Sequence, residues 1–112
     1  MSEQFRCYIR IRLGKEESPA HSTFGPGVAS LLRGIEATGS LYSSAKGMGM
    51  AYSKAWKTLQ LVEEELGWPL IKRNGPRGSE LTERGRKLLT AYQRMQEAAD
   101  RAVMEILDEK PF

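Results

Sequence analysis

Residues 28–66 contain three helical patterns separated by two short breaks, and this arrangement constrains the fold more than any other feature of the sequence. The patterns cover residues 28–37, 41–46 and 51–66, where apolar side chains recur at three- and four-residue steps. Breaks this short do not let the flanking helices lie apart, so consecutive helices must cross closely. The sequence therefore predicts a compact unit of three helices.

Both breaks carry residues that suit the end of one helix and the start of the next. Gly39 ends the first helix, and Ser40 can cap the second because its hydroxyl accepts from the free amides of a first turn. The second break, at residues 47–50, reads Gly-Met-Gly-Met, and Gly49 can take the positive φ of a tight bend. Ala45 is expected to be small because two helices cross closely there, and Met48 and Met50 are expected in the core under the bend.

A breaker-rich segment and a long helix follow. Residues 70–73 and 79–81 are typical of short strands around a turn at 74–78, which predicts a hairpin. Thr82 is placed to cap a helix that ends at about residue 109. Its apolar residues alternate four- and three-residue steps, the spacing of two packed helices. The expected dimer interface consists of Leu88, Tyr92, Met95, Ala99, Ala102 and Ile106.

Residues 5–13 alternate strictly between two kinds of side chain, which predicts a half-buried strand followed by a loop up to residue 27. One face holds Phe5, Cys7, Ile9, Ile11 and Leu13, and the other holds Arg6, Tyr8, Arg10 and Arg12. Cys7 is expected as a buried small hydrophobe, with a redox role as the alternative. The arginines are expected on a solvated face, with an auxiliary phosphate contact as the alternative.

Length and composition exclude several classes of protein. A chain of 112 residues has room for one domain, and its one cysteine and one histidine exclude a disulfide framework and a His/Cys zinc site. His21 lies in a loop-like stretch that does not suit a catalytic triad. We predict no catalysis, no cofactor and no metal. No stretch approaches the roughly 20 apolar residues of a membrane span, and the first residues lack a signal-peptide pattern, so a cytoplasmic location is expected.

The charge distribution says more than the net charge of +3. The excess of Lys and Arg lies in residues 1–58, including Lys46, Lys54 and Lys57, whereas residues 63–65 are three consecutive glutamates. An acidic run repels phosphate and must point away from DNA, which fits a third helix that enters a major groove by its N-terminal end. The alternative for Lys54 and Lys57 is a solvated helix face.

The order of elements is that of a winged helix-turn-helix, mostly α with a small β element. Its expected parts are an N-terminal strand and loop (1–27), a helix-turn-helix core (28–66), a wing (67–81) and a dimerisation helix (82–109). From Thr38 to Gly85 the sequence resembles the LysR-type regulators, and more closely the N-terminal DNA-binding domain of the molybdate-responsive ModE regulators. The resemblance rests on residues 36–40, Ala45, Gly49, Tyr52, Ala55, Trp56, Leu66, Gly67, Leu70, Arg73 and the spacing Leu81-Thr82-x-x-Gly85.

The resemblance implies a homodimeric transcription regulator that binds double-stranded DNA. The positions that match the DNA-facing region are Ser40, Tyr52, Ser53, Lys54, Lys57 and Thr58, and those that match the wing are Lys72, Arg73 and Arg77. The chain departs from the ModE pattern in two ways. It ends at Phe112 without the molybdate-binding region, so molybdate sensing is not implied unless a separate protein supplies it, and Lys57 stands where ModE-type domains can carry an acid.

Three alternatives stay open at this point. Tyr52 and Trp56 are interpreted either as core aromatics or as part of the DNA-facing surface. A winged helix can also serve as a protein–protein interaction module, which an exposed apolar patch on the third helix would favour. The remaining alternative is a small-molecule-responsive regulator with its pocket at the dimer seam.

Overall fold

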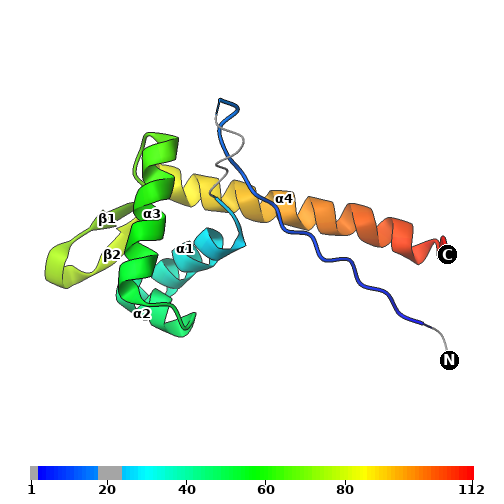
Figure 1. The fold of residues 1–112 in the computed structure, drawn as a ribbon, viewed down its shortest axis with the longest axis horizontal. Helices are drawn as coiled ribbons and strands as arrows, with labels where there is room; N and C mark the ends of the chain where they lie inside the picture. Colours follow the sequence, from blue (N-terminus) through cyan, green and yellow to red (C-terminus); the bar gives the residue numbers. More distant parts are fainter. Residues whose placement is uncertain (1–2, 18–23) are drawn as a thin grey trace.

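The computed structural model describes residues 3–17 and 24–112 and places the elements in the predicted order (Figure 1). The helices are α1 (Pro26–Thr38), α2 (Leu41–Gly47), α3 (Tyr52–Leu66) and α4 (Glu83–Asp108). The antiparallel strands β1 (Ile71–Arg73) and β2 (Ser79–Leu81) flank the short 3-10 turn η2 (Gly75–Arg77). This confirms the predicted fold class, a mostly helical winged helix-turn-helix, and the expected helix bounds hold to within two residues.

The core lies between α1, α2, α3 and the base of the hairpin. Helix α1 turns its apolar stripe inward, and α3 contributes the stripe that the sequence predicts. The largest fully buried side chains are Phe24, Leu31, Leu32, Ile35, Leu59, Leu70, Leu89 and Val62. This cluster holds the three short helices in one rigid unit.

Helices α1 and α2 approach most closely at Gly34 and Ser44. A Cβ on Gly34 would overlap the Ser44 side chain, and the Ser44 hydroxyl donates to the carbonyl of Leu31 at 2.7 Å. The expectation of a small residue at this crossing is confirmed by Ala45, which is buried beside Ser44. The crossing therefore depends on residues without bulk.

The bend between α2 and α3 agrees with the prediction except at one residue. Gly49 has φ +67°, the left-handed conformation that glycine favours, and Met50 packs against the core. Met48 is 39% exposed, so its expected place in the core is wrong. The physical reason is its position as the C-cap of α2, beyond the last turn that faces the core.

The base of the hairpin is fastened to the corner between α1 and α2. The Ser79 amide donates to the carbonyl of Gly39 at 2.8 Å, and a Cβ on Gly78 would overlap the same carbonyl. Gly78 has φ +93°. The wing therefore leaves the body of the protein in a fixed direction.

The start of α4 explains the spacing Leu81-Thr82-x-x-Gly85. The Thr82 side chain accepts from the Gly85 amide at 2.9 Å, which confirms the predicted N-cap, and its hydroxyl donates to the carbonyl of Pro69 at 2.9 Å. A Cβ on Gly85 would overlap the carbonyl of Leu70. The motif therefore lets the first turn of α4 pack directly on the chain that leads into β1.

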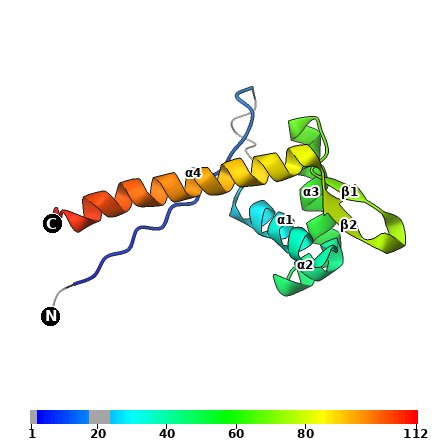
Figure 2. The same ribbon diagram turned by 180° about the vertical axis from the view of Figure 1, so that it is seen from behind.

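The strand predicted over residues 5–13 is not formed within the described residues. The segment is extended and runs beside α4 in both views (Figures 1 and 2), but among the described residues its only ladder partner is Phe24, which pairs with Leu13 in a single bridge. Ile9, Ile11 and Leu13 are half-buried, whereas Cys7 is exposed, so the expected burial of Cys7 is wrong.

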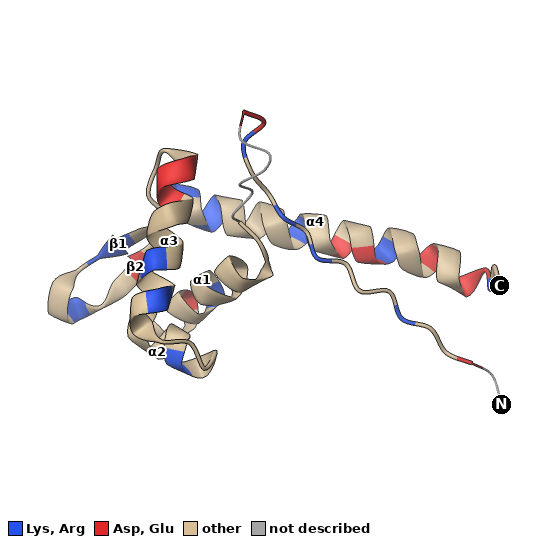
Figure 3. Ribbon diagram, in the orientation of Figure 1, with Lys and Arg blue, Asp and Glu red and all other residues tan. Residues whose placement is uncertain are grey.

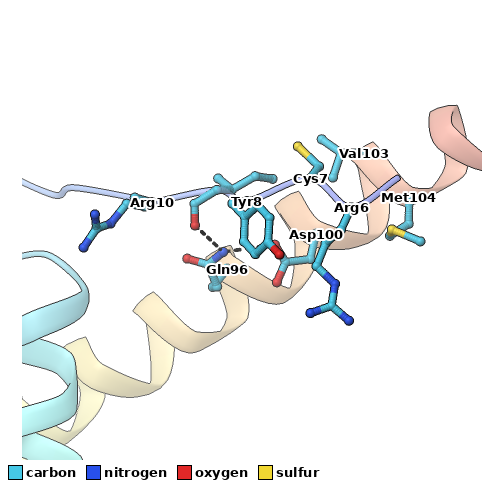
Figure 4. A pocket seen from close by; sticks show the side chains of 9 residues that line it. Arg6, Cys7, Tyr8, Arg10, Gln96, Asp100, Val103 and Met104 are labelled. Carbon is cyan, nitrogen blue, oxygen red and sulfur yellow. Dashed lines mark hydrogen bonds between the residues drawn. The ribbon is translucent and has the colours of Figure 1, made fainter. Parts of the chain in front are cut away.

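Only the second half of the apolar face is half-buried, and a helix rather than a neighbouring strand contacts this part of the segment. The Gln96 amide donates to the carbonyl of Ile9 at 3.1 Å, and the Tyr92 hydroxyl donates to the carbonyl of Ile11 at 2.8 Å. Figure 4 shows residues 6–10 lying along α4, where an open hollow of about 700 Å³ is lined by Arg6, Cys7, Tyr8, Ile9, Arg10, Gln96, Asp100, Val103 and Met104.

Helix α4 leaves the body of the protein after its first turns (Figures 1 and 2). Tyr92 is only 3% exposed, its ring lies edge-on to Phe24 at 5.2 Å, and burial raises its pKa. Tyr92 therefore belongs to the core of its own chain, which corrects its place in the expected dimer interface. Of the other residues in that set, Leu88 and Ala99 are half-buried, and Met95, Ala102 and Ile106 are exposed.

No helix in residues 3–17 and 24–112 is both long and apolar enough to cross a membrane. The same residues contain no group of three His, Cys, Asp or Glu side chains that could hold a metal ion. His21 lies outside the described residues.

Candidate nucleic-acid interface

Helix α3 separates a buried face from a charged one. Ala55, Leu59 and Val62 point into the core, whereas Lys54 and Lys57 are exposed on the first two turns. The heptad-like spacing of the buried residues leaves both lysines outside the stripe, as the sequence predicts. Of the other expected contacts on this helix, Tyr52 and Ser53 are exposed and Thr58 is half-buried.

The first turn of α3 leaves backbone donors available. Its N-cap is Ala51, whose methyl side chain cannot accept from the first amides of the helix. The N-terminal end of a helix also carries partial positive charge. Together with Lys54, this end of α3 forms a surface suited to an anion such as phosphate.

Two tyrosines stand side by side where α2 and α3 meet. Tyr42 is 59% exposed and Tyr52 is 47% exposed, and their ring centroids lie 6.2 Å apart. At this exposure Tyr52 is not a core aromatic, because most core aromatics lose nearly all of their contact with water. Its expected contact with DNA stays a prediction. An open hollow of about 380 Å³ adjoins the two rings and is lined by Tyr42, Lys46, Gly49, Met50, Ala51 and Tyr52.

The wing brings further cations to the same part of the molecule. Lys72, Arg73 and Arg77 are exposed, and the guanidinium carbon of Arg73 lies 4.7 Å from the ring centre of Trp56 on α3. A guanidinium over an indole face is a favourable cation–π contact. Trp56 is half-buried and packs against the core, so it combines a core role with that of a platform for the wing.

Glu63 fastens the wing from the other side. Its carboxylate accepts from the amides of Leu70 at 2.7 Å and Ile71 at 3.3 Å. Hydrogen bonds to a charged acceptor are stronger than neutral ones. The first glutamate of the acidic run therefore turns toward the base of β1, where it satisfies two backbone donors.

Charge is segregated along this end of the molecule (Figure 3). Lys and Arg lie on α2, on the N-terminal half of α3 and on the hairpin, whereas three glutamates lie at the C-terminal end of α3. The hairpin also carries one acid, Glu80 on β2, which pairs in register with Lys72 on β1. We call the exposed cations of α2, α3 and the hairpin the basic face. It consists of Lys46, Lys54, Lys57, Lys72, Arg73 and Arg77.

Ser40 differs from the other residues expected at DNA. It is half-buried, and its hydroxyl oxygen accepts from the Ser43 amide at 3.1 Å, which confirms the predicted cap of α2. This bond commits one lone pair of the oxygen to the fold, and the hydroxyl hydrogen remains available as a donor.

The sequence matches a known protein family. Residues 30–86, just over half of the sequence, match the family of bacterial regulatory helix-turn-helix proteins of the lysR type. The chain belongs to the LysR family. The matched residues include α2, α3, most of α1, the wing and the first turn of α4, so the basic face lies on the family's DNA-binding domain.

Solved LysR structures agree with this assignment. The DNA-binding domain of CbnR in complex with DNA matches with a TM-score of 0.60 and 26% identity, over 75% of this chain and 94% of that one. The LysR family regulator CbnR itself gives a TM-score of 0.57 and 26% identity, over 70% of this chain and 27% of that one. ArgP from Mycobacterium tuberculosis gives a TM-score of 0.57 at 24% identity, over 75% of this chain and 31% of that one, which supports the fold alone.

The chain spans less than a third of the longer regulators CbnR and ArgP. The search of curated proteins found no match. These comparisons establish the LysR relationship, and the narrower resemblance to ModE regulators stays a prediction.

Two residues of this interface were missed from the sequence. Tyr42 could have been found, because it lies off the helical face formed by Leu41, Ser44 and Ala45 and must therefore point outward. The role of Glu63 had no local signal, since the amides that it binds lie seven and eight residues further along the chain.

Proposed function

We propose that this LysR-family domain is a sequence-specific transcription regulator that acts as a homodimer on a pseudo-palindromic site. In this proposal α3 enters the major groove by its N-terminal turns, and the wing lies along the backbone. The carrying observation is that the exposed cations of α2, α3 and the hairpin lie at the same end of the molecule. The solved complex of the CbnR DNA-binding domain with DNA supports the same class of partner.

Each group on the basic face has chemistry that suits this role. Lysine and arginine side chains neutralise phosphate, and arginine can also bind base edges or enter a minor groove. Hydroxyl groups can bind either phosphates or bases. The residues that we propose as DNA contacts are Ser40, Lys46, Tyr52, Ser53, Lys54, Lys57, Thr58, Lys72, Arg73 and Arg77.

The proposed dimer rests on the outer face of α4. Met95 is 37% exposed and Ile106 is 55% exposed, and Ala102 lies exposed between them on the same side of the helix. Apolar side chains at this spacing fit a second helix of the same kind. Sedimentation at micromolar concentration should show a dimer, and a monomer would contradict this part of the proposal.

Selection of bound sequences from random duplex DNA tests the function directly. The wild-type chain should enrich a pseudo-palindrome whose half-sites are spaced by whole helical turns. A variant with Lys54→Ala and Lys57→Ala should enrich the same sequence weakly or not at all. Arg101→Ala is the control for loss of a positive charge elsewhere, because it removes one exposed cation from the C-terminal half of α4, at the other end of the molecule.

One observation favours the alternative of a protein-interaction module. Tyr42 and Tyr52 form an exposed aromatic pair beside the start of α3, and exposed aromatics are typical of protein interfaces. Failure of the wild-type chain to enrich any DNA sequence would favour this alternative over DNA binding.

A further inference from the structure

We propose that the hollow between Tyr42 and Tyr52 binds the 5-methyl group of a thymine in the major groove, and that Tyr42 decides this preference. The inference rests on the proposed function, because it requires the start of α3 to face base edges. It adds a base-specific site and a residue, Tyr42, that neither the family match nor the charge pattern identifies.

The two rings form neighbouring walls of the hollow. Tyr42 lies in the first turn of α2, and Tyr52 is the first residue of α3. Their ring planes meet at 46°, so the rings are tilted toward each other rather than stacked flat. A tilted pair leaves ring surface on both tyrosines available to a third group.

The remaining lining combines polar and apolar groups. Gly49, Met50 and Ala51 contribute backbone and aliphatic atoms, and Lys46 contributes the one charged side chain that lines this hollow. Among the groups that base pairs present in the major groove, the thymine methyl is the apolar one. The two ring faces, together with the aliphatic atoms of Met50 and Ala51, therefore offer a thymine methyl an apolar contact beside the proposed recognition helix, while Lys46 can neutralise an adjacent phosphate.

Tyr42 is not needed by the fold. The residues of α2 that face the core are Leu41, Ser44 and Ala45, and Ser40 fixes the first turn through its bond to the Ser43 amide. The ring of Tyr42 is more than half exposed and makes its ring contact with Tyr52. Replacing it should open one side of the hollow and leave the helices in place.

The test replaces single thymines by uracil, which lacks the methyl group, in one half-site of the duplex obtained by selection. For the wild-type chain, one of these replacements should weaken binding about fourfold, the value of one buried methyl group. In Tyr42→Ala this difference between thymine and uracil should disappear, whereas Tyr42→Phe should keep it. Tyr8→Ala, which removes an exposed tyrosine beside α4, is the control and should also keep it.

Several results would overturn the proposal. Equal binding of every uracil duplex by the wild-type chain would show that no thymine methyl is recognised. Equal weakening of thymine and uracil duplexes by both Tyr42→Ala and Tyr42→Phe would assign the hydroxyl to a phosphate instead. An enriched half-site without thymine would refute this inference alone, whereas failure to enrich any sequence would refute the proposed function with it.

Discussion

The two ends of this molecule obtain their stability in different ways. The head, residues 24–82, buries the apolar stripes of its short helices against one another, and Leu59 and Ile35 are fully enclosed. The arm, residues 3–12 together with 93–112, is one long helix accompanied by one extended segment, and Phe5 and Ile106 are each more than half exposed. In the head, the apolar side chains pack against other apolar side chains of the same chain. In the arm, only some of them do, and the others stay exposed.

Within the arm, one side of α4 contacts another part of the chain and a second side does not. The extended segment covers the side of α4 that carries Gln96 and Val103. The side that carries Met95 and Ile106 stays open. We infer that the segment completes the chain's own packing and leaves the second stripe for the proposed dimer.

The largest expected loss of stability comes from a substitution in the core of the head, compared with one on the arm. Leu59→Ala should destabilise the protein by about 2–5 kcal/mol, because a fully buried side chain leaves a cavity that the helices cannot close. Ile106→Ala in dilute protein should change the unfolding free energy by less than about 0.5 kcal/mol, as exposed substitutions do. Urea unfolding of both variants measures the difference, and equal losses would contradict the division into head and arm.

The next effect concerns the junction of α3 with the wing. Glu63→Ala removes the acceptor of two backbone amides and should cost about 1–3 kcal/mol. Glu64→Ala removes a neighbouring exposed carboxylate and should cost little. Thermal unfolding of the two variants compares them, and a similar stability would show that Glu63 does not hold the wing.

A smaller effect is expected where the head joins the arm. Thr82→Ala removes the N-cap of α4 and should cost about 1 kcal/mol, whereas Thr82→Ser should retain most of the stability. Chemical unfolding monitored by circular dichroism tests this, and a loss in the serine variant equal to that in the alanine variant would assign the effect to the methyl group instead.

An effect of similar size is expected where the arm attaches to the head. Tyr92→Phe removes the hydrogen bond to Ile11 and should cost about 1 kcal/mol at neutral pH. Burial raises the pKa of Tyr92 above 10.0, with Arg33 and Arg10 offsetting part of the shift, so the neutral phenol is favoured in the folded state. This contribution is complete below pH 10 and is lost as the pH rises further.

Unfolding free energies measured between pH 8 and 11 follow this loss. The wild-type protein should lose stability more steeply than Tyr92→Phe above pH 10. Parallel profiles for the two proteins would remove Tyr92 from the account of alkaline stability.

Sequence reasoning predicted the head well because its signals are local. Ser40 and Thr82 cap helices through amides three residues away, and Gly49 makes a bend within its own turn. Each signal depends on near neighbours in the chain, so residue type and spacing suffice to interpret it.

The arm was predicted less well because its contacts are distant. The alternation of residues 5–13 predicts one buried face, but only part of that face is half-buried, and one of the contacts that hold the segment joins Ile9 to Gln96, 87 residues away. An extended segment shows the same alternation of apolar and polar residues whether a helix or a strand packs against it. The exposure of Met48 and Cys7 likewise depends on where the neighbouring helices end. The periodicity of the sequence does not define these end points.

The most direct test of the central claim, that the basic face binds DNA, is the salt dependence of binding to the selected duplex. The wild-type affinity should fall steeply with added salt, and the variant with Lys54→Ala and Lys57→Ala should bind more weakly with a shallower slope, by about 1 for each phosphate contact removed. Arg101→Ala should keep the wild-type slope. Equal affinities and slopes for all three proteins would contradict the account.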